Sequence, residues 1–359
     1  MVAPHVAALA AGMLVAGTIN TVATKLQDMT PVDADGTLFY HPALQSAAMF
    51  LGEALCLGGA AFQTARAGRR RGDDAAARAP SRASRTAILA FALPAACDAA
   101  ATTALNMGLA LTSASSFQML RGTLVAWAGL FTQVLLRRRL RAHHWFGIFL
   151  IAAGAAVVGA ATVVFEGGGG GGGGGRGGVA AGGLPSPSSP PPPPSPASAS
   201  NPALGIALII ASQAVTALQF ILEEALLSRH RLPALLAVGL EGAWGLVLCA
   251  AALPLLGAPF SRPDGSLAPP IDDVRAGLAA VAASPRLAGS MALTIASIAA
   301  FNACGLSVTK RLSGAGRAAT DATRTLAVWG VALVAGWETF GPGGWLKVLG
   351  FALLLLGAA

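Results

Sequence analysis

The sequence predicts an all-α membrane protein with ten transmembrane helices arranged as two inverted five-helix repeats. Three observations lead to this prediction. The chain of 359 residues is 54% hydrophobic and only 11% charged, against roughly 25% charged in an ordinary soluble domain. Its lysines and arginines fall mainly on one side of the predicted spans. Its two halves repeat weakly on either side of a linker rich in glycine and proline. A mean hydropathy of +0.64 excludes both a soluble globular enzyme and a wholly disordered chain.

A transmembrane helix needs about 20 mostly apolar residues, and the sequence contains ten candidate segments. The first lacks a basic region before its apolar run, so we expect an uncleaved span and not a signal peptide. The last has 16 residues and would be about 24 Å long, so a truncated tenth helix is one interpretation. The predicted spans are Val6–Lys25, Pro42–Thr64, Thr86–Ala110, Ser113–Leu136, Trp145–Val164, Ala203–Leu227, Ala234–Gly257, Leu287–Thr309, Ala318–Phe340 and Gly344–Ala359.

The basic residues predict the orientation of these spans. If the N-terminus is cytosolic, 16 of the 24 lysines and arginines fall in cytosolic loops and 6 on the opposite side, and the remaining two, Arg121 and Arg324, lie within spans. This is the bias that the positive-inside rule requires of a protein with both termini in the cytosol. The net charge of +8 is therefore interpreted as membrane topology, and no nucleic-acid partner is expected.

The chain divides into residues 1–165, a linker at 166–202 and residues 203–359. The linker contains nine consecutive glycines, Gly167 to Gly175, and is predicted to be a flexible, non-cytosolic tether. The two halves match at polar positions, which indicates an internal repeat; chance similarity between apolar helices is the alternative. The matches are Arg121-Gly-Thr-Leu-Val-Ala-Trp127 with Arg324-Thr-Leu-Ala-Val-Trp329, Gln118 with Asp321, Glu53 with Glu241, and Asn20 with Glu223. Because each half has an odd number of spans, the second half would enter the membrane in the opposite direction.

Charged residues inside the spans are the candidate functional residues, because each costs about 2.5 to 3.5 kcal/mol at the bilayer centre. Arg121 and Arg324 are predicted to be symmetry-related substrate anchors, and an internal ion pair between Asp321 and Arg324 is the structural alternative. The acidic surplus favours a cationic solute, or carboxyl groups that carry protons, since burial favours the protonated form. The substrate-cavity candidates are Arg121, Arg324, Gln118, Asp321, Asn20 and Asn302, and the coupling candidates are Glu53, Glu241, Asp98, Glu223 and Glu224.

The sequence predicts neither an enzyme nor a site for a metal or a cofactor. The four cysteines form no CxxC or Cys/His spacing, so neither a disulfide framework nor a metal site is predicted. The pair Glu223-Glu224 before Arg229 is similar to the Glu-Glu-x-x-x-Arg signature of membrane-embedded prenyl-protein proteases. Here four residues separate Glu224 from Arg229, and the accompanying histidine elements are missing. A non-transporting membrane adaptor remains open as an alternative.

One segment resembles a known family. Leu111-Thr-Ser-Ala-Ser-Ser-Phe-Gln-Met-Leu-Arg121-Gly122 is similar to the signature of the F subfamily of solute carrier family 35, within the EamA-like drug/metabolite transporter superfamily. Further similarities, which extend over nearly the whole chain, occur at His41-Pro42, Met49–Glu53, Cys97-Asp98, Leu222–Glu224, Glu241-Gly242, Gly305–Lys310, Asp321, Arg324-Thr325 and Gly336–Glu338. The Gly/Pro linker and the end of the chain after Gly357 depart from the family pattern.

The resemblance implies ten helices in two inverted repeats, residence in an endomembrane such as the lysosome, vacuole or Golgi, and kinship with carriers of the chloroquine-resistance type. Together with the charges, it predicts a secondary active transporter of a small organic solute, with proton coupling as a further hypothesis. The expected partners are a small-molecule substrate and the lipid bilayer, and a homodimer is an open alternative. A nucleotide-sugar antiporter is a less favoured interpretation, because nucleotide phosphates would require more lysine or arginine in the cavity.

Overall fold

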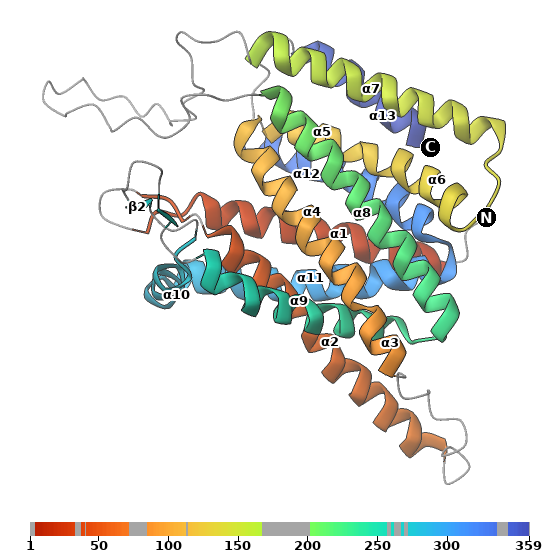
Figure 1. Cartoon of the computed structure of the whole chain (residues 1–359), viewed down its shortest axis with the longest axis vertical. Helices are drawn as coiled ribbons and strands as arrows, with labels where there is room; N and C mark the ends of the chain where they lie inside the picture. The colour runs from red at the N-terminus through yellow and green to blue at the C-terminus, as the bar shows by residue number, and fades with distance from the viewer. Residues whose placement is uncertain are drawn as a thin grey trace, which may run out of the picture.

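The computed structural model describes residues 4–32, 37–39, 41–71, 85–112, 114–166, 202–256, 260–261, 267–268, 272–335 and 344–358. In this part of the chain, helices form a bundle with α7 and α13 at one edge and α2 extending beyond the opposite edge (Figure 1). Two short strands, β1 (Phe260–Ser261) and β2 (Leu267–Ala268), pair antiparallel. The predicted linker lies outside the described residues except for its two end residues.

Seven helical segments are long and apolar enough to cross a membrane, as judged by length and composition. Six are single helices that correspond to predicted spans over most of their length. One of these six, α11, follows the short helix α10 (Val274–Ala283). The third predicted span consists of α3 (Arg85–Ala90) and α4 (Ala92–Leu111). The others are α1 (Pro4–Asp28), α2 (Pro42–Arg71), α7 (Ala142–Glu166), α8 (Pro202–His230), α9 (Ala234–Leu256) and α11 (Pro285–Arg311).

The three remaining predicted spans are also helical, but each differs from an ordinary apolar span. The fourth is interrupted and consists of α5 (Ala114–Leu120), the 3-10 turn η2 (Arg121–Thr123) and α6 (Leu124–Leu135). The ninth, α12 (Gly314–Val334), carries three charged side chains. The tenth, α13 (Gly344–Ala358), has 15 residues.

Local sequence explains the two interruptions. Pro94 cannot donate a hydrogen bond to the carbonyl of Ala90, which is where α3 ends, and a proline ring also crowds the carbonyl four residues before it. In the fourth span, Gly122 and Thr123 are weak helix formers, and the Thr123 hydroxyl donates to the Leu120 carbonyl at 2.8 Å. A 3-10 stretch inside a helix often marks a functional hinge.

Four helix pairs pack most extensively: α1 with α11, α4 with α8, α7 with α13, and α2 with α9. Glycine allows two of these pairs to approach closely. A Cβ atom on Gly242 of α9 would lie 2.4 Å from the backbone nitrogen of Ala54 in α2, and one on Gly154 of α7 would lie 2.5 Å from the carbonyl oxygen of Gly350 in α13. Small residues that let backbones approach are the usual basis of helix association in membranes.

Candidate functional site

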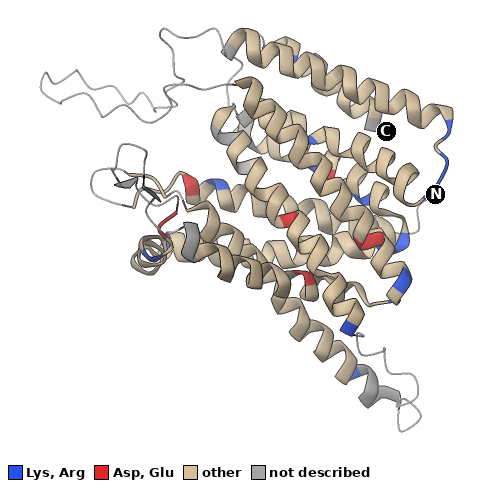
Figure 2. Cartoon of the chain, viewed as in Figure 1, with Lys and Arg blue, Asp and Glu red and all other residues tan. Residues whose placement is uncertain are grey.

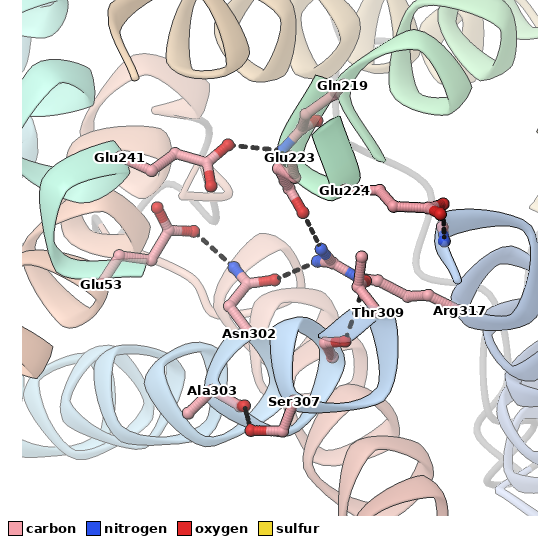
Figure 3. A network of polar contacts seen from close by, with 12 residues as sticks. Glu53, Gln219, Glu223, Glu224, Glu241, Asn302, Ala303, Ser307, Thr309 and Arg317 are labelled. Atoms are coloured by element: carbon pink, nitrogen blue, oxygen red, sulfur yellow. Dashed lines mark hydrogen bonds and ion pairs between the residues drawn. The ribbon is translucent and has the colours of Figure 1, made fainter. Parts of the chain in front are cut away.

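The charged residues are distributed unevenly over the bundle. Most lysines and arginines lie near the right-hand edge in Figure 2, whereas acidic residues also occur in the middle of the helices. Five of the acidic and amide side chains in the interior join one arginine in a single polar network (Figure 3). The six members of this network are Glu53 of α2, Gln219 and Glu223 of α8, Glu241 of α9, Asn302 of α11 and Arg317 of α12.

Arg317 is the cation of this network. It is 1% exposed and forms an ion pair with Glu223, which is fully buried. Its Nη2 atom donates to Asn302 Oδ1 at 2.8 Å, and its guanidinium carbon lies 3.9 Å from the centre of the Phe220 ring. A Cβ atom on Gly305 would lie 2.8 Å from Arg317 Nε, so glycine at this position makes room for the guanidinium group.

Two further carboxyl groups belong to the network without a cation of their own. Asn302 Nδ2 donates to Glu53 Oε1 at 2.5 Å, while Glu53 Oε2 is buried without a hydrogen-bond partner in the described structure. Gln219 Nε2 donates to Glu241 Oε1 at 2.8 Å and to Glu223 Oε1 at 3.1 Å. The network therefore places three buried acidic side chains around one arginine, and two of them are held only by amide groups.

Glu224 makes a separate set of contacts at the end of α8. Its Oε2 atom accepts a hydrogen bond from the backbone N–H of Gly314 at 2.7 Å. Its Oε1 atom lies 2.7 Å from Nη1 of Arg138, an exposed side chain in the loop after α6. The carboxylate therefore connects the first turn of α12 with the segment that follows α6.

Asp321 and Arg324 form a second buried charged group on α12. Arg324 Nε lies 2.9 Å from Asp321 Oδ1, and Arg324 also lies 4.8 Å from the centre of the Phe301 ring. Arg121 differs from Arg324, because it is half-buried and its buried Nε atom has no hydrogen-bond partner among the described residues. Electrostatic interactions connect it to Arg324 and Asp321. The described contacts do not join Gln118 to Arg121.

Two predicted site residues lie outside the central network. Asn20 is buried and its Nδ2 atom donates to the Thr294 carbonyl at 3.3 Å and to Ser297 Oγ at 3.4 Å, which joins α1 to α11. Asp98 is half-buried on α4, and Thr102 Oγ1 donates to it at 3.5 Å. The structure thus joins Glu53, Glu223, Glu241 and Asn302 by hydrogen bonds in one network. Asp98 makes no described hydrogen bond to that network but interacts electrostatically with Glu223 and Arg317.

Sequence analysis missed Arg317. It counted this residue in the loop before the ninth predicted span, which it began at Ala318, whereas the structure places Arg317 inside helix α12, which begins at Gly314. The signal was present in Ser313, whose side chain accepts a hydrogen bond from Gly316 N–H and caps the helix, as serine commonly does at helix N-termini. Gln219 and Arg138 were also missed, because an amide within a span and an arginine in a basic loop carry no specific signal.

Known proteins resemble the chain over most of its length. Solute carrier family 35 member F6 of Mus musculus is 36% identical over 356 residues, which are 98% of this chain and 87% of that protein. The human protein of the same name is 35% identical over 356 residues, with the same shares. An uncharacterized protein of Schizosaccharomyces pombe is 29% identical over 349 residues, 96% of this chain and 94% of that one. No family model matches the chain.

A solved crystal structure of a protein with 14% sequence identity has a TM-score of 0.54 and covers 99% of this chain and 98% of that chain. At this identity the likeness concerns the fold alone. The apolar helices and the relatives together make the chain an integral, multi-pass membrane protein. Because more than a third of the aligned residues are identical over most of both chains, the chain belongs to solute carrier family 35.

Proposed function

We propose that this protein is a secondary active transporter that moves a small organic solute by alternating access, with a proton as the coupling ion. The observation that carries this proposal is the buried polar network, to which α8 contributes two side chains and α2, α9, α11 and α12 contribute one each. Charges inside a membrane are costly, and they commonly mark substrate or ion pathways. An adaptor that only binds partners has no use for such an interior.

Alternating access requires two arrangements of similar energy, and we propose that two inverted repeats of five helices supply them. The first repeat would contain α1 to α7 and the second α8 to α13. In these repeats α1 corresponds to α8, α2 to α9, α4 to α11 and α7 to α13. If each helix is replaced by its counterpart, the pair α1–α11 becomes the pair α8–α4, and the pairs α2–α9 and α7–α13 remain the same pairs. These are the four pairs that pack most extensively, which supports the repeat that the polar matches in the sequence predict.

We propose Glu53 and Glu241 as the proton-carrying residues. They occupy corresponding helices, α2 and α9, in the two proposed repeats. Both side chains are buried, and Arg317 is already paired with Glu223. Two like-charged carboxylates in a low dielectric without a cation favour a shared proton or a bound cationic group. An organic cation that competes with protons for Glu53 and Glu241 would be transported across the membrane in exchange for protons.

Orientation and compartment are part of the same proposal. The edge at which basic residues gather in Figure 2 would face the cytosol, according to the positive-inside rule. Both termini would then be cytosolic. An acidic endomembrane compartment, such as the lysosome or vacuole, would supply the proton gradient on the other side.

The proposal can be tested with purified protein in liposomes. We expect a pH gradient to drive accumulation of a solute from a panel of small amines, amino acids and nucleotide sugars, and a pH-sensitive dye to report the accompanying proton flux. Liposomes without protein provide the baseline. A folded protein that transports no class of solute above that baseline would contradict the proposal and favour the adaptor.

A further inference from the structure

We propose that the two consecutive glutamates of α8 and the first turn of α12 form an ionic gate, which closes one end of the transport path. This inference rests on the proposed alternating access and names the contacts that must break during it. The gate consists of Glu223, Glu224, Gly314 and Arg317, with Arg138 as an exposed arm.

Both glutamates hold the same turn of α12. Glu223 pairs with Arg317, and Glu224 accepts a hydrogen bond from the Gly314 N–H at 2.7 Å. The N-terminal N–H groups of a helix lack partners inside the helix and attract negative charge. The Glu224 carboxylate therefore stabilises the N-terminus of α12, and Glu223 stabilises the guanidinium group of Arg317 in the same turn. Charge-assisted hydrogen bonds are stronger than neutral ones, and four buried groups are therefore fixed within one turn.

The contacts join α8 to α12. α8 packs most extensively against α4 and then α6, and α12 packs against α1 and α6 and slightly less against α8 and α11. Arg138 adds the segment after α6 to the same junction through its 2.7 Å contact with Glu224. Movement of α12 away from α8 would break the ion pair of Arg317 and both contacts of Glu224 together.

Among the residues that the structure describes, no ion pair joins α1 to α5 or α6 at the corresponding end of the first repeat. The residue equivalent to Arg317, seven positions before Arg121, is Ala114. Asn20, the predicted counterpart of Glu223, donates instead to Thr294 and Ser297 of α11. In the part of the chain that the structure describes, no extensive packing joins α1 to α5 or α6, although α8 packs extensively against α12.

In the proposed cycle, this difference between the two ends would distinguish the two states of the molecule. Two inverted repeats exchange their conformations when a transporter switches sides, so a contact that is present in one repeat and missing from the other distinguishes the closed end from the open end. In the proposed cycle, the end at which α8 finishes and α12 begins is the closed end, and the opposite end would be the one that opens to solvent. Under the proposed topology, the closed end is cytosolic.

Hydrogen–deuterium exchange in lipid nanodiscs tests the gate without knowledge of the solute. We expect Glu223→Gln and Arg317→Gln to accelerate exchange of the backbone amides in the first turns of α12 by about tenfold or more, the effect of losing one charge-assisted hydrogen bond. The matched control is the double variant Asp321→Asn/Arg324→Gln, which removes an ion pair contained within α12. It should leave exchange of that first turn unchanged.

The double variant Glu223→Gln/Arg317→Gln separates a gate from a contact needed only for folding. It leaves neither member of the Glu223–Arg317 ion pair as an unpaired charge, so its melting temperature should return toward that of the parent protein, while exchange at the start of α12 stays fast. Exchange that returns to the parent rate in this variant would overturn the gate. An opened gate in a protein that moves no solute would instead overturn the proposed function and leave the gate standing.

Discussion

Arg324 lies against Asp321 on the same helix, with Nε 2.9 Å from the carboxylate oxygen Oδ1, and the pair is buried. Three positions along a helix place two side chains on one face, so the arginine carries its own counter-ion. Arg121, its predicted counterpart in the first repeat, has no acidic residue on its own helical segment and interacts electrostatically with both Arg324 and Asp321. The two arginines therefore occupy corresponding sequence positions in different electrostatic surroundings.

This difference predicts opposite effects of neutralising the two arginines. Arg324→Gln leaves Asp321 as an unpaired buried charge, and removing one partner of a buried pair costs about 3–5 kcal/mol. Arg121→Gln removes a cation that forms no ion pair among the described residues and that Arg324 repels more than Asp321 attracts it, so it should leave the melting temperature of the purified protein unchanged or raise it. If the two variants lose the same stability, the two arginines are equivalent after all.

A further variant checks the reason for the effect at Arg324. Asp321→Asn/Arg324→Gln removes both charges and should recover most of the stability that Arg324→Gln loses. Solute uptake should fall in Arg121→Gln despite normal folding, since a charge that the fold does not need is retained for function. Normal uptake in Arg121→Gln would remove this residue from the site.

Sequence patterns predicted the helices well where a span is uniformly apolar, and less well where function changes the pattern. The long apolar run of Trp145–Val164 falls within α7 as expected. The start of α12 was placed four residues late, because Gly314, Arg317 and their neighbours are too polar for an apolar window. The 3-10 turn at Arg121 was missed for a related reason, since hydropathy reports composition and not backbone geometry.

The candidate site was predictable only in part. Intramembrane charge is a local signal, and it identified Glu53, Glu223 and Glu241, which the structure joins with Asn302 in one network. The cation of this network, Arg317, could not be identified by hydropathy, because it stands at a helix end where arginines are ordinary. Which residues of different helices meet depends on packing between α8, α9, α11 and α12, and one sequence contains no direct record of it.

Close packing of α2 against α9 gives a prediction about stability. A Cβ atom on Gly242 would lie 2.4 Å from the backbone nitrogen of Ala54, so Gly242→Ala must push the helices apart. Overpacking typically costs about 1–3 kcal/mol, which should appear as a lower melting temperature. Gly58→Ala is the matched control on the same helix pair, because nothing lies within 4 Å of its added Cβ atom. Equal melting temperatures of the two variants would contradict the described approach.

The proposed topology predicts opposite sides for two segments that lie mainly outside the described residues. Single cysteines in the basic segment Arg66–Arg85 and in the linker Glu166–Pro202, introduced after replacement of the four native cysteines, should react with a membrane-impermeant maleimide from opposite sides. The basis is the excess of basic residues on one side of the spans. Labelling of both positions from the same side would refute the arrangement of ten spans.

The last prediction concerns coupling. A carboxyl group in a closed, dry cavity favours its neutral form, and the same group facing water favours the charged form. Because Glu53 and Glu241 occupy corresponding helices of the proposed repeats, their environments should exchange as the transporter switches sides. A proton would then be bound on one side of the membrane and released on the other.

Replacing either residue with glutamine imitates the protonated state permanently. Glu241→Gln should abolish uphill transport driven by a pH gradient, while exchange of solute for solute down its gradient continues, because that exchange needs no net release of a proton. Glu241 keeps a polar neighbour in this variant, since the amide can still hydrogen-bond with Gln219, so the network should remain folded. Paired measurements of pH-driven uptake and solute exchange in the same liposomes separate lost coupling from lost binding. A normal response to the gradient in both Glu53→Gln and Glu241→Gln would exclude these two residues, and Asp98, half-buried on α4, would become the next coupling candidate.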